Sequence, residues 1–165
     1  MKNPEALTLA MDYAAAMENC AAYVAVKGPA IREPEAAVRI LRPLMTAATN
    51  GNSQECFMVI LLDVKNKCIG IPRECMRGLL DTCPVHPREI FREAVRDSAA
   101  SVILAHNHPS GDPTPSKEDI DITRRLLEAG RVLGIRVTDH VIVGRPSPET
   151  PGYVSLREKN LVAFE

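Results

Sequence analysis

The stretch LAHNHPSGDPTPSKED, residues 104 to 119, concentrates residue types that bind metal ions. His106 and His108 are separated by one residue, and alternate residues of an extended segment point to the same side, so both imidazoles can reach one point. Ser116 and Asp119 follow at the spacing of a helix capping box. Two imidazoles and one carboxylate can hold zinc and leave a fourth position open, as catalytic zinc sites require. The pattern therefore predicts a Zn²⁺ cofactor.

Asp119 adds most to this interpretation. On a helix beginning near Ser116, it shares a face with the apolar side chains of Ile122, Leu126, Ala129 and Leu133. A carboxylate in line with a buried face needs a partner, because an unpaired buried charge is costly. Simpler interpretations remain open: Ser116 and Asp119 can be helix caps only, and one histidine can be a surface residue.

Helices and strands alternate around this stretch. The hydrophobic pattern predicts helices over residues 4–23, 33–48, 87–99 and 116–133, the last of them closed by Gly134. Strands are expected over residues 55–63, 68–74, 101–106, 135–144 and 153–156. The expected fold class is α/β, a mixed sheet flanked by helices, with the histidines at a strand end.

Composition narrows the function classes. The hydrophobic fraction of 45% and the charged fraction of 25% are ordinary for a globular domain. The net charge of -1 and the scattered arginines disfavour duplex nucleic acid as a main ligand, although a local patch stays open. Five cysteines without a C-x-x-C pair predict reduced thiols, and the absence of a long apolar run predicts a cytoplasmic protein without membrane partners.

The spacing of His106, His108, Ser116 and Asp119 is that of the JAMM motif of JAB/MPN zinc metalloproteases. The surrounding residues, AHNHPSGDPTPSKEDIDITRRLLEAGRVLGIRVTDHVIVG, closely resemble the RadC branch of that family. The resemblance implies a JAB/MPN-type, cytidine-deaminase-like α/β fold over residues 31–165, preceded by an N-terminal helical extension over residues 1–30. It also implies a zinc-dependent metallopeptidase that hydrolyses a peptide or isopeptide bond, with His106, His108 and Asp119 as metal ligands.

The remaining motif member is a glutamate on an early strand, and Glu55 in QECFMVILLD falls at the matching position. The residues alone leave other acids open, namely Asp63, Glu74, Glu89 and Glu93. The resemblance implies that Glu55 is the general acid and base. Ser116 is either a stabiliser of the oxyanion or only the helix cap.

Two further histidines lie outside the motif. His86 and His140 are expected to be structural, and Asp139 is a candidate to orient a ligand histidine. Ser110 and Asp112 are expected to shape the loop.

The chain departs from the family in two places. Residues 1–30 do not match the helix-hairpin-helix region of RadC-like proteins, and Cys56 stands where histidine is frequent, which alters the expected pocket wall. The alternative function is a RadC-type accessory protein of DNA repair without proteolytic activity. The sequence does not identify the protein or peptide substrate, and it leaves a homo-oligomer open.

Overall fold

The computed structural model describes residues 4–27, 30–49, 51, 53–78 and 85–164. Its helices are α1 (Pro4–Lys27), α2 (Pro34–Ala48), α3 (Pro87–Arg96) and α4 (Lys117–Leu133). Its strands are β1 (Glu55–Leu62), β2 (Arg73–Gly78), β3 (Ser101–Asn107), β4 (Arg136–Val143) and β5 (Tyr153–Ser155). No helix in these ranges is long and apolar enough to cross a membrane.

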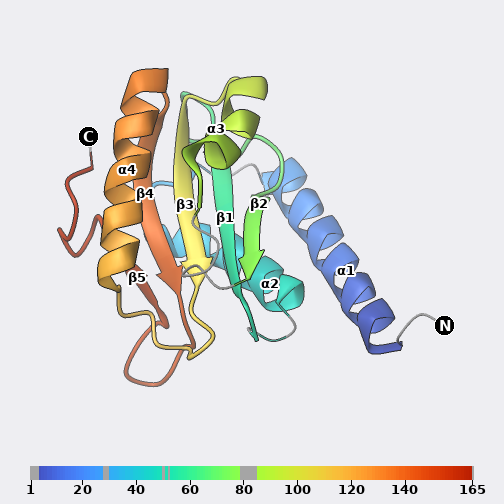
Figure 1. Ribbon diagram of the computed structural model, residues 1–165. Helices are drawn as coiled ribbons and strands as arrows, with labels where there is room; N and C mark the ends of the chain where they lie inside the picture. Colours follow the sequence, from blue (N-terminus) through green and yellow to red (C-terminus); the bar gives the residue numbers. More distant parts are fainter. Residues whose placement is uncertain (1–3, 28–29, 50, 52, 79–84, 165) are drawn as a thin grey trace.

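The strands form a single mixed sheet in the order β2-β1-β3-β4-β5 (Figure 1). β3 and β4 are parallel, and the other neighbouring pairs are antiparallel. α2 packs on one face of the sheet and α3 and α4 on the other, so the sheet has an apolar cluster on each side. The expected mixed α/β sheet flanked by helices is confirmed.

β1 and β3 lie inside the sheet because most of their residues are apolar. Every residue of β3 is buried, as are seven of the eight residues of β1. A strand that is buried on both faces needs apolar residues at every position rather than at alternate ones. This burial makes β1 and β3 the scaffold on which the polar residues at their ends are positioned.

The second strand lies later in the sequence than expected. The prediction placed it over residues 68–74, whereas β2 covers Arg73–Gly78 and only a single bridge joins Cys68 to Leu62. Gly70 adopts a positive φ of 66°, and Pro72 has no N–H for a ladder bond, so the chain turns before pairing with β1 resumes.

The buried face of α4 also differs from the predicted one. Its buried residues are Asp119, Thr123, Leu126 and Gly130. Leu133, which was expected on this face, is 50% exposed, and Ile122 and Ala129 are only partly buried. Asp119 and Leu126 are buried as predicted, but the helix is rotated so that Thr123 and Gly130, rather than Ile122, Ala129 and Leu133, complete the face toward the sheet. The two polar residues of this face, Asp119 and Thr123, therefore lie in the N-terminal half of α4.

Candidate metal centre

Three elements deliver the predicted metal ligands to one place. His106 is near the end of β3, His108 begins the following loop, and Asp119 is in the first turn of α4. Hydrogen bonds fix the backbone at both ends of the loop between β3 and α4. The His108 N–H donates to the carbonyl of Val143, which extends the β3–β4 pairing by one bond, and Ser116 caps α4. The sheet and the helix terminus thus hold the ligand candidates from opposite sides.

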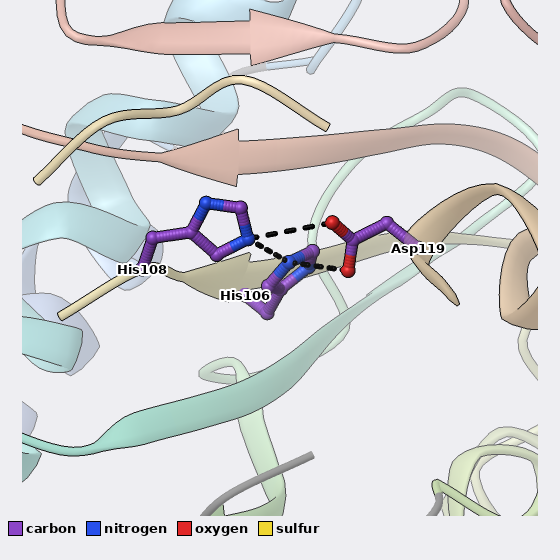
Figure 2. Close-up of side chains that lie close together, drawn as sticks. All are labelled: His106, His108 and Asp119. Carbon is purple, nitrogen blue, oxygen red and sulfur yellow. Dashed lines mark hydrogen bonds and ion pairs between the residues drawn. The ribbon is translucent and has the colours of Figure 1, made fainter. Parts of the chain in front are cut away.

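The imidazoles and the carboxylate converge closely (Figure 2). His106 Nε2 is 3.0 Å from Asp119 Oδ1, and His108 Nε2 is 3.4 Å from Asp119 Oδ2. The two Nε2 atoms are 3.1 Å apart. Among the described residues, these three form a group whose ligand atoms all lie within 4.8 Å of one another. The predicted ligands are therefore brought together.

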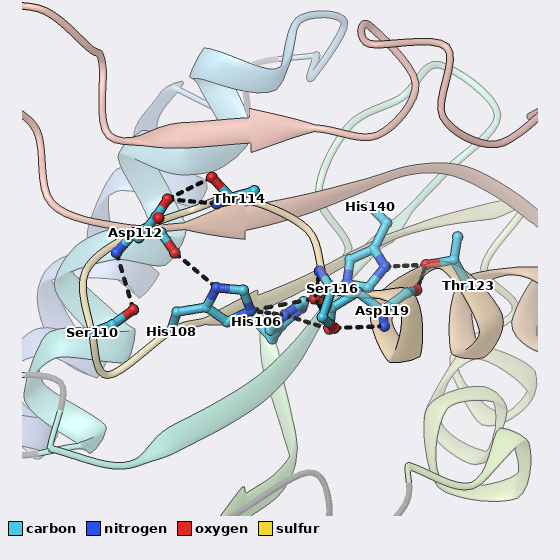
Figure 3. A network of polar contacts seen from close by, with 9 residues as sticks. All are labelled: His106, His108, Ser110, Asp112, Thr114, Ser116, Asp119, Thr123 and His140. Carbon is cyan, nitrogen blue, oxygen red and sulfur yellow. Dashed lines mark hydrogen bonds and ion pairs between the residues drawn. The ribbon is translucent and has the colours of Figure 1, made fainter.

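His108 is oriented by its own loop (Figure 3). Its Nδ1 is 2.8 Å from the carbonyl oxygen of Asp112. A carbonyl can only accept, so Nδ1 carries the proton and the Nε2 lone pair faces the carboxylate. The Asp112 side chain accepts from the N–H and hydroxyl of Thr114, at 2.9 and 2.7 Å, and the Asp112 N–H donates to Ser110. Ser110 and Asp112 shape the loop, as expected.

A second loop supports the first. The Arg145 N–H donates to the carbonyl of Gly111 at 2.8 Å. A Cβ added at Gly144 would lie 2.4 Å from the same Gly111 oxygen and 2.8 Å from Pro113 Cδ. Only glycine permits so close an approach of two backbones. Gly144 is therefore required for the loop that orients His108.

His106 is oriented by side chains in the core. Its Nδ1 is 2.9 Å from His140 Nε2, and His140 Nδ1 is 2.5 Å from the hydroxyl of Thr123. The ring of Phe57 stacks on His106, with centroids 5.9 Å apart and planes inclined by 2°. Burial holds the pKa of His140 well below its usual value. His140 was expected to be structural, and its contacts agree.

Asp119 makes the predicted capping box with Ser116. The Asp119 N–H donates to Ser116 Oγ at 3.1 Å, and the Ser116 N–H donates to Asp119 Oδ2 at 2.7 Å. The Ser116 hydroxyl also donates to Oδ2 at 2.7 Å. Burial raises the pKa of Asp119, but hydrogen bonds to His106 and His108 outweigh it and leave the pKa well below its usual range. The carboxylate is ionised.

The donor set fits a cation. His108 directs a lone pair at an ionised carboxylate, and His106 Nε2 lies between them, so the converging atoms need a positive charge among them. In the metal-free chain a proton on His108 can supply it: the hydrogen bond to Asp119 is the main reason that the pKa of His108 is raised. A zinc ion satisfies the same atoms, because neutral imidazole and carboxylate are its ordinary ligands.

Glu55 lies beside this group at the start of β1. Phe57 pairs with His106 across β1 and β3, and alternation puts Glu55 on the same face as Phe57. The pKa of His108 is raised mainly by its hydrogen bond to Asp119, and the charge of Glu55 adds a smaller contribution in the same direction. The other acidic candidates lie elsewhere: Asp63 is in the β1–β2 turn, Glu74 binds Arg77, and Glu89 and Glu93 are on α3.

The side chain of Asn107 binds the main chain on both sides of Glu55. Its side-chain oxygen accepts from the Cys56 N–H at 2.8 Å, and its side-chain nitrogen donates to the carbonyl of Gln54 at 2.9 Å. The amide thus replaces a main-chain pair where the β1–β3 register ends at His106. Sequence reasoning missed Asn107, although its place between the two histidines predicts that it points the opposite way.

Two expectations about neighbouring residues, Asp139 and Cys56, are corrected by the structure. Asp139 does not contact the ring of a ligand histidine: its carboxylate accepts from the Ser155 hydroxyl and from the main-chain N–H of His140, and it faces the other side of β4 from the His140 ring. Cys56 does not line the site, because it is buried in the cluster on the α2 face. His86 precedes α3 and is outside the ligand group.

The described cysteines are unpaired, as expected. Cys20, Cys56, Cys68 and Cys75 are free thiols, and Cys83 lies outside the described residues.

The fold and the metal-ligand group together define a JAB/MPN-type domain. The family model for the RadC-like JAB domain matches residues 31–161. The chain belongs to this family, as the resemblance of its motif implied.

Similar proteins support the same family. A UPF0758 protein of Caldanaerobacter subterraneus is 54% identical over 113 residues, which are 68% of this chain and 46% of that protein. A UPF0758 protein of Symbiobacterium thermophilum is 52% identical over 130 residues, 78% of this chain and 51% of that protein. The chain spans about half the length of the curated relatives it matches. Their names state no activity.

Proposed function

We propose that this chain is a zinc-dependent metallopeptidase that hydrolyses a peptide or isopeptide bond in a protein or peptide substrate. The observation that carries the proposal is the convergence of His106, His108 and Asp119, with a further carboxylate, Glu55, on the same side of the sheet. Three protein ligands are the set found in catalytic rather than structural zinc sites, since the fourth position stays open.

A bound zinc ion supplies a Lewis acid that polarises a carbonyl group and lowers the pKa of water. The chain supplies the proton transfers. In the proposed reaction Glu55 accepts a proton from the attacking water and then donates it to the leaving amine, which is general base and general acid catalysis by one carboxylate. The position of Glu55 at the partly exposed start of a buried strand keeps it accessible to substrate while its backbone is held.

Asn107 positions Glu55 in this reaction. Its amide bonds to the peptide groups before and after Glu55, so the carboxylate is held relative to the strand that carries both histidines. The bond from the Cys56 N–H is buried, so water does not compete for it. A general base misplaced by about 1 Å loses about 100-fold in rate, which is the reason for such a clamp.

Ser116 has two roles in the proposal. Its hydroxyl completes the capping box, which orients Asp119. With Asp119 engaged as a metal ligand, the Ser116 hydroxyl would be available to donate a hydrogen bond to the oxyanion formed during hydrolysis. The exposure of Ser116 permits this second role.

Hydrolysis by Glu55→Gln tests the proposal. The variant keeps the shape of the side chain but removes the base, so we expect unchanged zinc content and loss of turnover on a panel of peptide and isopeptide substrates. Glu128→Gln on the exposed side of α4 is the matched control and should retain full activity. Normal turnover by Glu55→Gln would remove this residue from the mechanism. Cleavage of nucleic acid, included in the panel, would replace the peptidase proposal.

A further inference from the structure

A buried series of contacts runs from the ligand His106 back to the helix that carries the ligand Asp119. His106 Nδ1 lies 2.9 Å from His140 Nε2, His140 Nδ1 lies 2.5 Å from Thr123 Oγ1, and Thr123 Oγ1 lies 2.5 Å from the carbonyl oxygen of Asp119. All three side chains, His106, His140 and Thr123, are 0% exposed, so water cannot substitute for any member. Figure 3 shows the series from end to end.

The acceptor at the end of the series, the carbonyl oxygen of Asp119, fixes the direction of every hydrogen bond before it. The Asp119 carbonyl can only accept, so the single hydroxyl proton of Thr123 is directed at it. Thr123 Oγ1 must then accept from His140, which puts a proton on His140 Nδ1. A neutral imidazole carries one ring proton, so His140 Nε2 is an acceptor and His106 Nδ1 is the donor. The lone pair of His106 is left on Nε2, the atom that faces Asp119 and His108.

We propose that His140 and Thr123 are positioning residues that fix His106 in the tautomer with its Nε2 lone pair directed into the metal site. The proposal rests on the metal-binding part of the proposed function and is independent of hydrolysis. Metal-bound histidines ordinarily donate their other ring N–H to a partner, and here a second histidine, itself fixed by a hydroxyl, replaces a carboxylate.

The series explains two features that burial alone does not. His140 is not a fourth ligand, because both of its ring nitrogens are occupied by His106 and Thr123. Thr123 is a polar residue on the buried face of α4, and it joins the main chain of one ligand residue to the side chain of another. The hydrogen bonds that join β3, β4 and α4 therefore also fix the direction of the His106 lone pair.

The experiment is two-dimensional ¹H–¹⁵N NMR of the histidine rings in the metal-free chain, above the pH at which its imidazoles titrate. We expect a proton on Nδ1 of both His106 and His140 in the native chain and in Thr123→Ser, which keeps the hydroxyl. In Thr123→Val, which has the same shape but no acceptor, His140 should move its proton to Nε2 and His106 should move its own to Nε2.

Zinc affinity, measured by competition with a chromophoric chelator, is the second readout. We expect Thr123→Ser to bind as the native chain does and Thr123→Val to bind about 10- to 100-fold more weakly, the usual effect of removing an outer partner of a ligand. The native chain alone keeps the proposal falsifiable if Thr123→Val does not fold: a proton on His106 Nε2 would overturn it. Unchanged tautomers and affinity in a folded Thr123→Val would do the same. Neither readout uses a substrate, so a failed peptidase assay leaves this test intact.

Discussion

The two histidines of the site are held in different ways. His106 has no exposed side-chain surface and is oriented by His140, a side chain of the neighbouring strand. His108 has a side chain that is 16% exposed and is oriented by the Asp112 carbonyl, five residues before α4. Because the first anchor is part of the packed core and the second is part of a loop, changes to the loop should affect His108 more than His106.

The largest contrast should come from removing each histidine. His106→Ala and His108→Ala should both abolish stoichiometric zinc binding, since each removes a ligand. They should differ in the stability of the metal-free chain. His106→Ala leaves a cavity against Phe57 and an unpaired His140 nitrogen, so we expect a loss of about 2 to 4 kcal/mol. His108→Ala should cost about 1 kcal/mol or less at a pH above the raised pKa of His108, where the ring that is removed carries no charge. Urea unfolding measures both, and equal losses would contradict the distinction between the two anchors.

Gly144→Ala should disturb mainly the loop-held histidine. The added methyl group would meet the Gly111 carbonyl and Pro113, so the loop must shift, at about 1 to 3 kcal/mol. We expect zinc affinity to fall about tenfold. The histidine NMR signals should change more for His108 than for His106, and His106 should keep its proton on Nδ1.

Gly51→Ala is the matched control for Gly144→Ala. Gly51 has a positive φ of 72° but nothing within 4 Å of an added Cβ, so alanine there strains the backbone without touching the site. Stability should fall by about 1 kcal/mol with unchanged zinc affinity. A shift of the His106 signals as large as that of the His108 signals, in Gly144→Ala alone, would show that the loop and the core anchor are coupled.

The pH dependence should distinguish the metal-free from the zinc-loaded chain. The pKa of His108 is raised by its hydrogen bond to Asp119, so the stability it contributes is complete below its ordinary pKa of 6.5 and is lost as pH rises through the raised value. The pKa of Asp119 is lowered, so its contribution is present above about 3.8 and is lost as the carboxylate protonates. The metal-free chain should therefore lose stability above neutral pH.

Bound zinc should remove the loss of stability above neutral pH. Protons compete with the metal for His108, so zinc affinity should rise over the same pH range in which metal-free stability falls. Urea midpoints of both forms at several pH values test this. In His108→Gln the alkaline decline of the metal-free chain should disappear; if it persists, another group is responsible.

The smallest effect should come from Thr114→Val. This change removes the hydroxyl bond to Asp112 but keeps the bond from the Thr114 N–H. We expect a loss of about 0.5 to 1 kcal/mol in stability and a reduction in zinc affinity of less than about threefold. A reduction as large as that of Gly144→Ala would mean that the side chain of Thr114, rather than the packing of the two loops, positions His108.

The sequence predicted one half of the site better than the other. The alternation of His106 and His108, the capping box of Ser116 and Asp119 and the turn residues of the loop are local patterns, because each depends on a spacing of a few residues. The core anchor depends on β4 lying parallel to β3, which brings His140 beside His106 from 34 residues away. No local spacing expresses that register.

The errors of the sequence-based prediction also arise where a residue's role depends on its neighbours in the fold. Thr123 did not stand out, because a single threonine in a helix is common and its value lies in facing His140. Asp139 was considered as an orienting residue because it is next to His140, but neighbours on a strand face opposite sides. β2 was placed early because residues 68–71 look like strand, whereas Gly70 and Pro72 turn the chain.

The most direct test of the metal site is the zinc content of the purified chain, measured by atomic spectroscopy after exposure to zinc and removal of free metal. We expect equimolar zinc in the native chain and in Glu55→Gln, and a negligible amount in Asp119→Ala. A native, folded chain that retains no zinc at any pH between 6 and 8 would contradict this expectation.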